Sequence, residues 1–155
     1  MTAAVCYYSR HHGNTLKILE AMARGPGPAL DLIDVTVRQE ADLSGYDLIG
    51  FASGVYYGKY HASVLDFARR CLPEGKAVFF ACTRGNPGKS AAGELSALAS
   101  QRSCRVLGEF SCRGFDTFGP FRLIGGISRG HPNQAESDEA AKFFAGLCEG
   151  LEQGR

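Results

Sequence analysis

Polar and glycine residues that could hold an anion lie near the start of the chain, between an apolar run and an amphipathic one. The apolar run Ala3–Tyr8 is of strand type, and Leu16, Leu19 and Met22 recur beyond it at helical spacing. A strand that feeds a glycine-containing loop at the start of a helix can bind phosphate, because the first-turn amides lack intrahelical partners and the helix dipole is positive there. We therefore predict a phosphate loop of Ser9, Arg10, His11, His12, Gly13, Asn14 and Thr15.

The same segment also fits a capped turn that binds nothing, since Ser, Gly and Asn cap many helices. It lacks the G-K-[ST] end of a P-loop and the G-x-G-x-x-G of a Rossmann fingerprint, so the anion it predicts is a small terminal phosphate. His11 and His12 have no further ligands at a metal-binding spacing, and we predict no metal site.

Two further loops with unusual chemistry follow apolar runs of strand type. The run at 46–52 leads into a loop of glycines and aromatics, from which we select Ser53, Gly54, Val55, Tyr56, Tyr57 and Gly58. The run at 76–82 leads into a loop from which we select Thr83, Arg84, Gly85 and Asn86. Tyrosine rings stack on flat ring systems, and glycines allow backbone amides to approach a ligand. With the first loop, these residues predict a pocket for a flat aromatic ring that carries a phosphate.

These loops need strands and helices that alternate, and the chain supplies them. Strands are predicted at 3–8, 30–37, 46–52, 76–82 and 104–112. Helices are predicted after the first, third, fourth and fifth strands, the third helix capped by Ser90 and the last starting near Ser137. This alternation predicts an α/β fold whose parallel sheet is covered on both faces, with ligands beyond the carboxyl ends of the strands. The three loops would then converge on one rim.

The bulk composition favours a single domain over residues 1–155. The formal net charge is +1 with both signs mixed along the chain, which argues against a nucleic-acid partner. No apolar run approaches the roughly 20 residues of a transmembrane helix, and the start lacks a signal-peptide pattern, so we expect a cytoplasmic protein. The six cysteines are scattered without a C-x-x-C pair, which favours buried, reduced thiols.

The order of the three loops resembles the FMN site of the flavodoxin-like family, over essentially the whole chain. Gly13-Asn14-Thr15 matches the end of the family's phosphate loop, Tyr57-Gly58 its aromatic second loop and Thr83–Asn86 its third. The resemblance implies a three-layer sandwich with a five-stranded parallel sheet in the order 2-1-3-4-5, and FMN as the cofactor. It also implies that Tyr57 stacks on the isoalloxazine and that the Gly58 carbonyl faces flavin N5. The run Tyr57-Gly58-x-x-His61 is most similar to the flavodoxin-type protoporphyrinogen oxidases.

Two departures from the family pattern bear on function. Arg10 and His12 stand where the family usually has hydroxyl residues, and the chain is near neutral where shuttle flavodoxins are strongly acidic. We expect a redox protein that transfers electrons through FMN to or from a partner protein. The alternatives are an FMN-dependent oxidoreductase, acting on NAD(P)H, a small quinone-like substrate or a porphyrinogen, and a non-redox module that binds another phosphate compound. No catalytic acid or base is predicted, and a monomer and a homodimer are both open.

The last long loop, 113–133, is rich in glycine and phenylalanine. We expect Phe115, Phe118 and Phe121 to cover the edge of the sheet, with a hydrophobic lid or partner surface beside the flavin as the alternative. His61 is expected to start the helix that follows the second loop rather than to act on a substrate.

Overall fold

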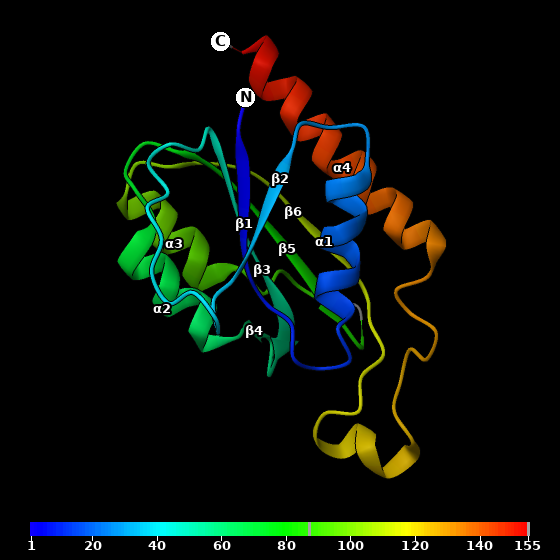
Figure 1. Ribbon diagram of the computed structural model, residues 1–155. Helices are drawn as coiled ribbons and strands as arrows, with labels where there is room; N and C mark the ends of the chain where they lie inside the picture. The colour runs from blue at the N-terminus through cyan, green and yellow to red at the C-terminus, as the bar shows by residue number, and fades with distance from the viewer. Residues whose placement is uncertain (87, 155) are drawn as a thin grey trace.

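Five parallel strands form the centre of the fold, which the computed structural model describes for residues 1–86 and 88–154 (Figure 1). They are β1 (Ala3–Tyr8), β2 (Leu30–Asp34), β3 (Leu48–Tyr56), β5 (Ala77–Arg84) and β6 (Arg105–Arg113). Their order is β2-β1-β3-β5-β6, which confirms the predicted order of the five parallel strands. A further strand, β4 (Lys59–Tyr60), pairs antiparallel with β3. Pro87, inside the third predicted loop, lies outside the described residues.

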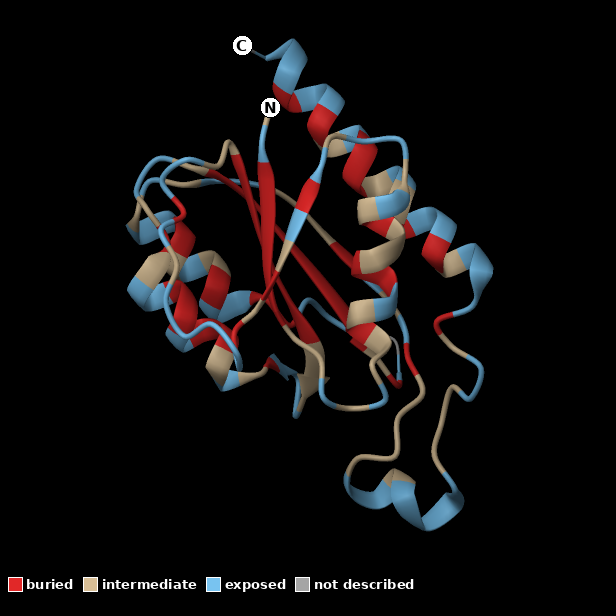
Figure 2. Cartoon of the chain, in the orientation of Figure 1, coloured by how far each residue is buried: buried red, intermediate tan, exposed pale blue. Residues whose placement is uncertain are grey.

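Helices cover both faces of this sheet (Figure 1). One face carries α1 (Asn14–Arg24) and α4 (Gln134–Gln153), and the other carries α2 (Ala62–Cys71) and α3 (Gly93–Gln101). Each layer has its own apolar core, and the buried residues of both cores meet at the strands (Figure 2). The strands are buried on both sides, which explains why their sequences read as continuous apolar runs. None of the helices in residues 1–86 and 88–154 has the length and hydropathy of a membrane span.

Several predicted bounds were wrong by a few residues. β3 continues past Ala52 to Tyr56, because Gly54 still pairs with Thr83 of β5. The residue that caps α3 is Ala92 rather than Ser90, whose hydroxyl instead accepts a hydrogen bond from the Ala92 amide at 3.2 Å.

The other two corrections lie at a strand end and a helix start. β2 ends at Asp34, whose carboxylate accepts a hydrogen bond from the Thr36 amide at 2.9 Å. This hydrogen bond stabilises a turn that ends the strand. The last helix starts at Gln134 rather than near Ser137, because Asn133 and Glu136 form a capping box.

Candidate functional site

Two adjoining cavities lie where β1, β3 and β5 end, at the lower end of the sheet in Figure 1. The inner cavity has a volume of about 20 Å³ and is lined by Ser9, His11, Asn14, Thr15, Gly54, Val55, Tyr56, Thr83, Arg84, Gly85, Gly114, Phe115, Asp116 and Phe118. The outer pocket has a volume of about 310 Å³ and is lined by Val55, Tyr57, Gly58, Arg84, Gly85, Asn86, Asp116, Phe118, Pro120 and Phe121. The structure thus brings all three predicted loops together at one site.

The start of α1 forms the anion-binding end of the inner cavity. Gly13 is the N-cap residue, with a left-handed backbone (φ 66°) and no side-chain cap. The Ser9 hydroxyl takes over that role by accepting from the Leu16 amide at 3.0 Å. The first-turn amides have no intrahelical acceptor and lie at the positive end of the helix dipole. With the side chains of Ser9, Asn14 and Thr15 in the cavity wall, this donor set fits a phosphate.

A buried hydroxyl pair joins the first loop to the third. Thr15 Oγ1 and Thr83 Oγ1 are 2.9 Å apart, and both side chains are buried. Since each hydroxyl can donate as well as accept, one O–H remains available to a further acceptor. The pair therefore fixes the separation of two loops that come from different strands.

Four of the predicted site residues lie outside both cavity walls. The Arg10 guanidinium points to the end of β2, where it donates to the Thr36 hydroxyl and lies 3.5 Å from an Asp34 carboxylate oxygen. His12 is exposed and packs its ring on Phe115 with the ring centroids 4.5 Å apart. Gly13 shapes the first loop through its left-handed backbone, and Ser53 holds the second loop through its hydrogen bonds; neither residue lines a cavity.

The second loop is a tight hairpin between β3 and β4 (Figure 1). Tyr57 and Gly58 form its turn with φ values of 50° and 76°, as a type I′ turn requires. A tyrosine rarely adopts a positive φ, and 86% of the Tyr57 side chain is exposed beside the outer pocket. Such local strain at an exposed aromatic residue is typical of a ligand-binding position.

Tyr56 turns inward from the same hairpin and lines the inner cavity. Its ring packs edge-on against Phe118, with the centroids 5.5 Å apart. Burial raises the pKa of Tyr56 to about 12, with smaller contributions from Tyr8 and Asp116. The phenol therefore stays protonated at neutral pH and can donate a hydrogen bond in the cavity.

Ser53 and His61 hold the hairpin against the rest of the fold. The Ser53 hydroxyl accepts from the His61 amide at 2.9 Å and donates to the Gly54 carbonyl. His61 is the N-cap of α2, where Nδ1 accepts from the Ser63 amide at 3.2 Å. Its ring stacks on Tyr8 with the centroids 3.7 Å apart. The expectation that His61 starts a helix is confirmed.

We expect this cap to weaken as the pH falls, because Nδ1 must be unprotonated to accept a hydrogen bond. Burial lowers the pKa of His61. A histidine whose folded pKa lies below its unfolded value of about 6.5 contributes stability that is complete above that value and lost as the pH falls toward the folded pKa. The urea midpoint should therefore fall less between pH 8 and pH 5 in His61→Asn, which caps without titrating, than in the native chain. Equal falls in the two proteins would contradict this role.

The site also contains residues 114–128 after β6, a segment that the predicted site residues do not include and for which a lid or partner surface was the alternative expectation. The Phe115 carbonyl accepts from the Asn14 side chain at 2.8 Å, and the Thr117 amide donates to His11 Nε2 at 3.2 Å. Ser128 donates to the Gly85 carbonyl at 2.6 Å, which ties the segment to the third loop. Phe115 and Phe118 line the inner cavity, so the expectation that they cover the sheet edge is wrong.

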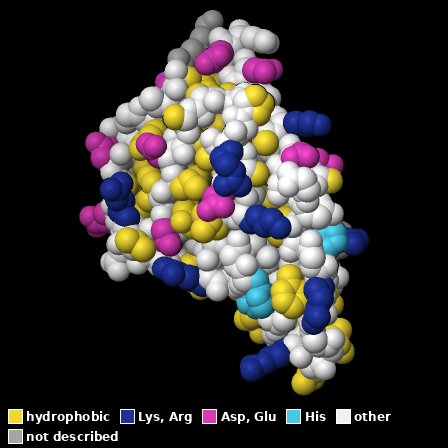
Figure 3. All heavy atoms as spheres, turned by 45° about the vertical axis from the view of Figure 1, so that its right-hand side comes forward, with side chains coloured by type: hydrophobic (Ala, Val, Ile, Leu, Met, Phe, Trp, Pro, Cys, Tyr) yellow, Lys and Arg dark blue, Asp and Glu magenta, His cyan; other side chains and the backbone are white. Residues whose placement is uncertain are grey.

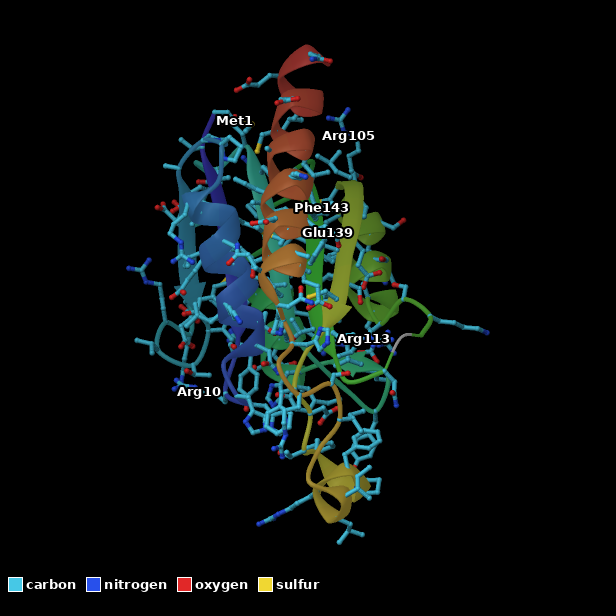
Figure 4. All side chains as sticks on the ribbon, turned by 90° about the vertical axis from the view of Figure 1, so that its right-hand side faces the viewer. Met1, Arg10, Arg105, Arg113, Glu139 and Phe143 are labelled. Carbon is cyan, nitrogen blue, oxygen red and sulfur yellow. The ribbon has the colours of Figure 1, made fainter. Side chains whose placement is uncertain are left out.

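An acidic residue from this segment stands between the two cavities. Asp116 lines both, accepts from the Phe118 amide at 2.7 Å and lies 3.3 Å from His11 Nε2. No local pattern marks Asp116 as a site residue in the sequence, because its partner His11 lies about a hundred residues away along the chain. Figure 4 shows Arg10 and Arg113 at this end of the sheet and Met1 and Arg105 at the opposite end.

Together, fold and site define an open, doubly wound α/β protein whose candidate site lies at the switch point between β1 and β3. The sequence model of the flavodoxin domain matches residues 4–110. This chain belongs to the flavodoxin domain family.

The chain is also similar to other proteins in sequence and in structure. An uncharacterized protein from Methanocaldococcus jannaschii is 34% identical over 145 residues, which cover 92% of this chain and 95% of that protein. The structure of a flavodoxin from the domain Archaea superposes with a TM-score of 0.70 at 18% identity, covering 98% of this chain and 99% of that one. General stress protein 14 from Treponema denticola, in complex with FMN, gives a TM-score of 0.61 at 12% identity and covers 97% and 98%. At these identities the two structures show the shared fold.

Proposed function

We propose that this chain binds FMN and passes electrons through it to or from a partner protein. The observation that carries the proposal is the pairing of two unlike cavities at one switch point. The inner cavity offers a helix N-terminus and hydroxyl groups, which suit a phosphate. The adjoining outer pocket offers Tyr57, Phe118 and Phe121, which suit a flat aromatic ring. A flavin mononucleotide has both parts, and a general stress protein of the same fold is known in complex with it.

In this arrangement Ser9, Asn14 and Thr15 hold the phosphate, and the Tyr57 hairpin flanks the ring. Bound FMN supplies reversible one- and two-electron transfer, while the protein sets its position and potentials. Phe118 lines both cavities and packs on Tyr56 and Tyr57, with centroids 5.5 and 5.2 Å apart. Because the inner cavity holds only about 20 Å³, we expect ligand binding to displace Phe118 from this position.

The decisive experiment is equilibrium dialysis of the purified chain against FMN, followed by its visible spectrum. We expect uptake of one FMN per chain and a perturbed flavin spectrum, with reversible bleaching on anaerobic reduction. A folded chain that takes up no FMN would overturn the proposal and leave a module that binds some other phosphate compound.

A second candidate is an FMN-dependent oxidoreductase that acts on a small quinone-like substrate. The observation in its favour is the apolar outer wall of Phe118, Pro120 and Phe121, which could also hold a flat substrate. Stopped-flow reduction by NADH and NADPH separates the two functions. Rapid two-electron reduction favours the oxidoreductase, and slow reduction, with stepwise uptake of single electrons from a mediator, favours the carrier.

We also predict a redox effect of Gly58, whose carbonyl is expected to face flavin N5. Gly58 has φ 76°, which an alanine adopts only with strain, although a Cβ there meets no atom within 4 Å. Gly58→Ala should therefore change the backbone rather than the packing, and narrow the gap between the two one-electron potentials of bound FMN. Spectroelectrochemical titration measures the gap, and an unchanged gap would refute the role of this carbonyl.

A further inference from the structure

The loops around the outer pocket carry an excess of positive charge. Residues 83–89 contain two basic and no acidic residues, and residues 113–133 contain three basic residues and one acidic residue. These two segments bring a net charge of +4 to a chain whose total is +1, so the rest of the chain has a net charge of −3. In Figure 3 the protruding lower end of the molecule shows basic and hydrophobic side chains, and the acidic side chains of that face lie higher.

Among residues 1–86 and 88–154, no carboxylate forms an ion pair with these cations. Arg84 donates to the backbone carbonyls of Asn86 and Lys89 at 2.8 and 2.7 Å. Arg129 lies over the Phe115 ring at 5.5 Å from its centroid. In the part of the chain that the structure describes, no ion pair involves Arg84, Arg129, Lys89 or Arg122. The acid of the segment, Asp116, has a side chain only 16% exposed and faces His11.

Exposed apolar side chains stand among these cations. The 3₁₀ helix η1 (Gly119–Ile124) projects beyond the sheet in Figure 1, and its Leu123 and Ile124 are 89% and 71% exposed. Tyr57 is 86% exposed on the hairpin that lines the same pocket. Arginine together with exposed aliphatic and aromatic side chains is the composition of a protein-binding surface rather than of an ordinary solvated one.

We propose that this cationic rim, formed by Arg84, Lys89, Arg122 and Arg129 with Leu123 and Ile124, docks a small acidic electron-transfer protein. The inference rests on the proposed function, since the partner's redox centre is brought to the outer pocket. One electron leaves the reduced centre of the partner and enters the bound flavin, and no bond forms between the proteins. Complementary charge would steer the encounter and fix its orientation.

The distribution of the cations favours a protein over a lipid surface. Arg84 is the last residue of β5 and Lys89 follows that strand, whereas Arg122 and Arg129 follow β6. Arg84 and Phe121 line the outer pocket together. A flat bilayer that met the projecting Leu123 and Ile124 would engage only the second group. A globular acidic partner seated over the pocket engages both.

The test is calorimetric titration of the purified protein with an acidic plant-type [2Fe–2S] ferredoxin as the probe, at 20 and 200 mM salt. We expect binding that weakens at least tenfold at the higher salt, because exposed charges are screened. At low salt, the variant Lys89→Glu/Arg122→Glu should bind ferredoxin at least tenfold more weakly than the native protein. The matched control Arg105→Glu/Lys142→Glu has the same net charge, lies outside both rim segments and should bind within threefold of the native protein.

Three results would overturn the proposal. They are equal losses in the two double variants, preferential binding of basic cytochrome c, and rim-dependent binding to vesicles of anionic phospholipid in place of ferredoxin. Calorimetry of docking needs no flavin chemistry, so failure here with FMN uptake intact rejects the docking surface alone. Failure of FMN uptake in dialysis rejects the proposed function instead.

Discussion

Replacing Asn14 with aspartate is expected to weaken FMN binding about 100-fold and to leave the affinity for riboflavin, which lacks the phosphate, within about fivefold. Asn14 is the first residue of α1 and lines the inner cavity. A carboxylate about 5 Å from a phosphate charge costs about 3 kcal/mol at an effective dielectric constant of 20, and each 1.4 kcal/mol is about tenfold in affinity. An acidic residue in the first turn favours the helix itself, so folding should survive.

Two further variants separate charge from hydrogen bonding. Asn14→Ala removes the donor to the Phe115 carbonyl without adding charge, so its loss of FMN affinity should be much smaller. Gln101→Glu makes the same amide-to-carboxylate change at an exposed residue of α3 and should leave both affinities unchanged. Fluorescence titration with FMN and riboflavin measures the four proteins. If Asn14→Asp lowered the affinities for FMN and for riboflavin equally, the phosphate would not lie at the start of α1.

Most of the fold could be predicted because buried parallel strands leave long apolar runs. The strand order came from the resemblance of the three loops, since periodicity alone does not order strands. β4 was missed because two residues produce no pattern, and the end of β3 was missed because Ser53-Gly54 has the composition of a loop. That stretch stays in the sheet because β5 pairs with it as far as Gly54–Thr83.

The site was predicted where local chemistry and chain order coincide, and missed where they separate. Ser9 directly follows β1 and Thr15 lies in the first turn of α1, so their types and spacing point to an anion. Asp116 and Phe118 follow β6, which is not one of the three strands at the switch point, and reach the site only through contacts such as Asn14 to Phe115. Arg10 was selected from the same loop, but its guanidinium lies 3.5 Å from Asp34 at the end of the neighbouring β2 and outside both cavity walls.

The largest expected effect on stability is that of Gly50→Ala, in the middle of β3. A Cβ at Gly50 would lie 2.4 Å from Phe79 Cζ and 2.6 Å from Cε1, well inside van der Waals contact. Phe79 is fully buried and packs on Phe143 and Phe144 of α4, with centroids 6.3 and 6.0 Å apart, so its ring cannot move without displacing that helix. Overpacking of this kind costs about 3 kcal/mol of unfolding free energy, which urea denaturation measures.

A smaller, non-aromatic side chain at position 79 should remove part of that cost, because the clash is between one methyl group and the edge of the Phe79 ring. Phe79→Leu by itself loses buried area and should lower the unfolding free energy. In the double variant with Gly50→Ala, the loss of unfolding free energy should be smaller than the sum of the two single losses by about 1 kcal/mol or more. Gly146→Ala is the matched control, since Gly146 is an exposed residue of α4 with no atom within 4 Å of its Cβ position. Alanine there should stabilise the helix by about 0.5–1 kcal/mol. Strict additivity of Gly50→Ala and Phe79→Leu would show that the glycine is required for the strand's backbone rather than for the ring. The clash with the Phe79 ring would then not be the cause of the cost of Gly50→Ala.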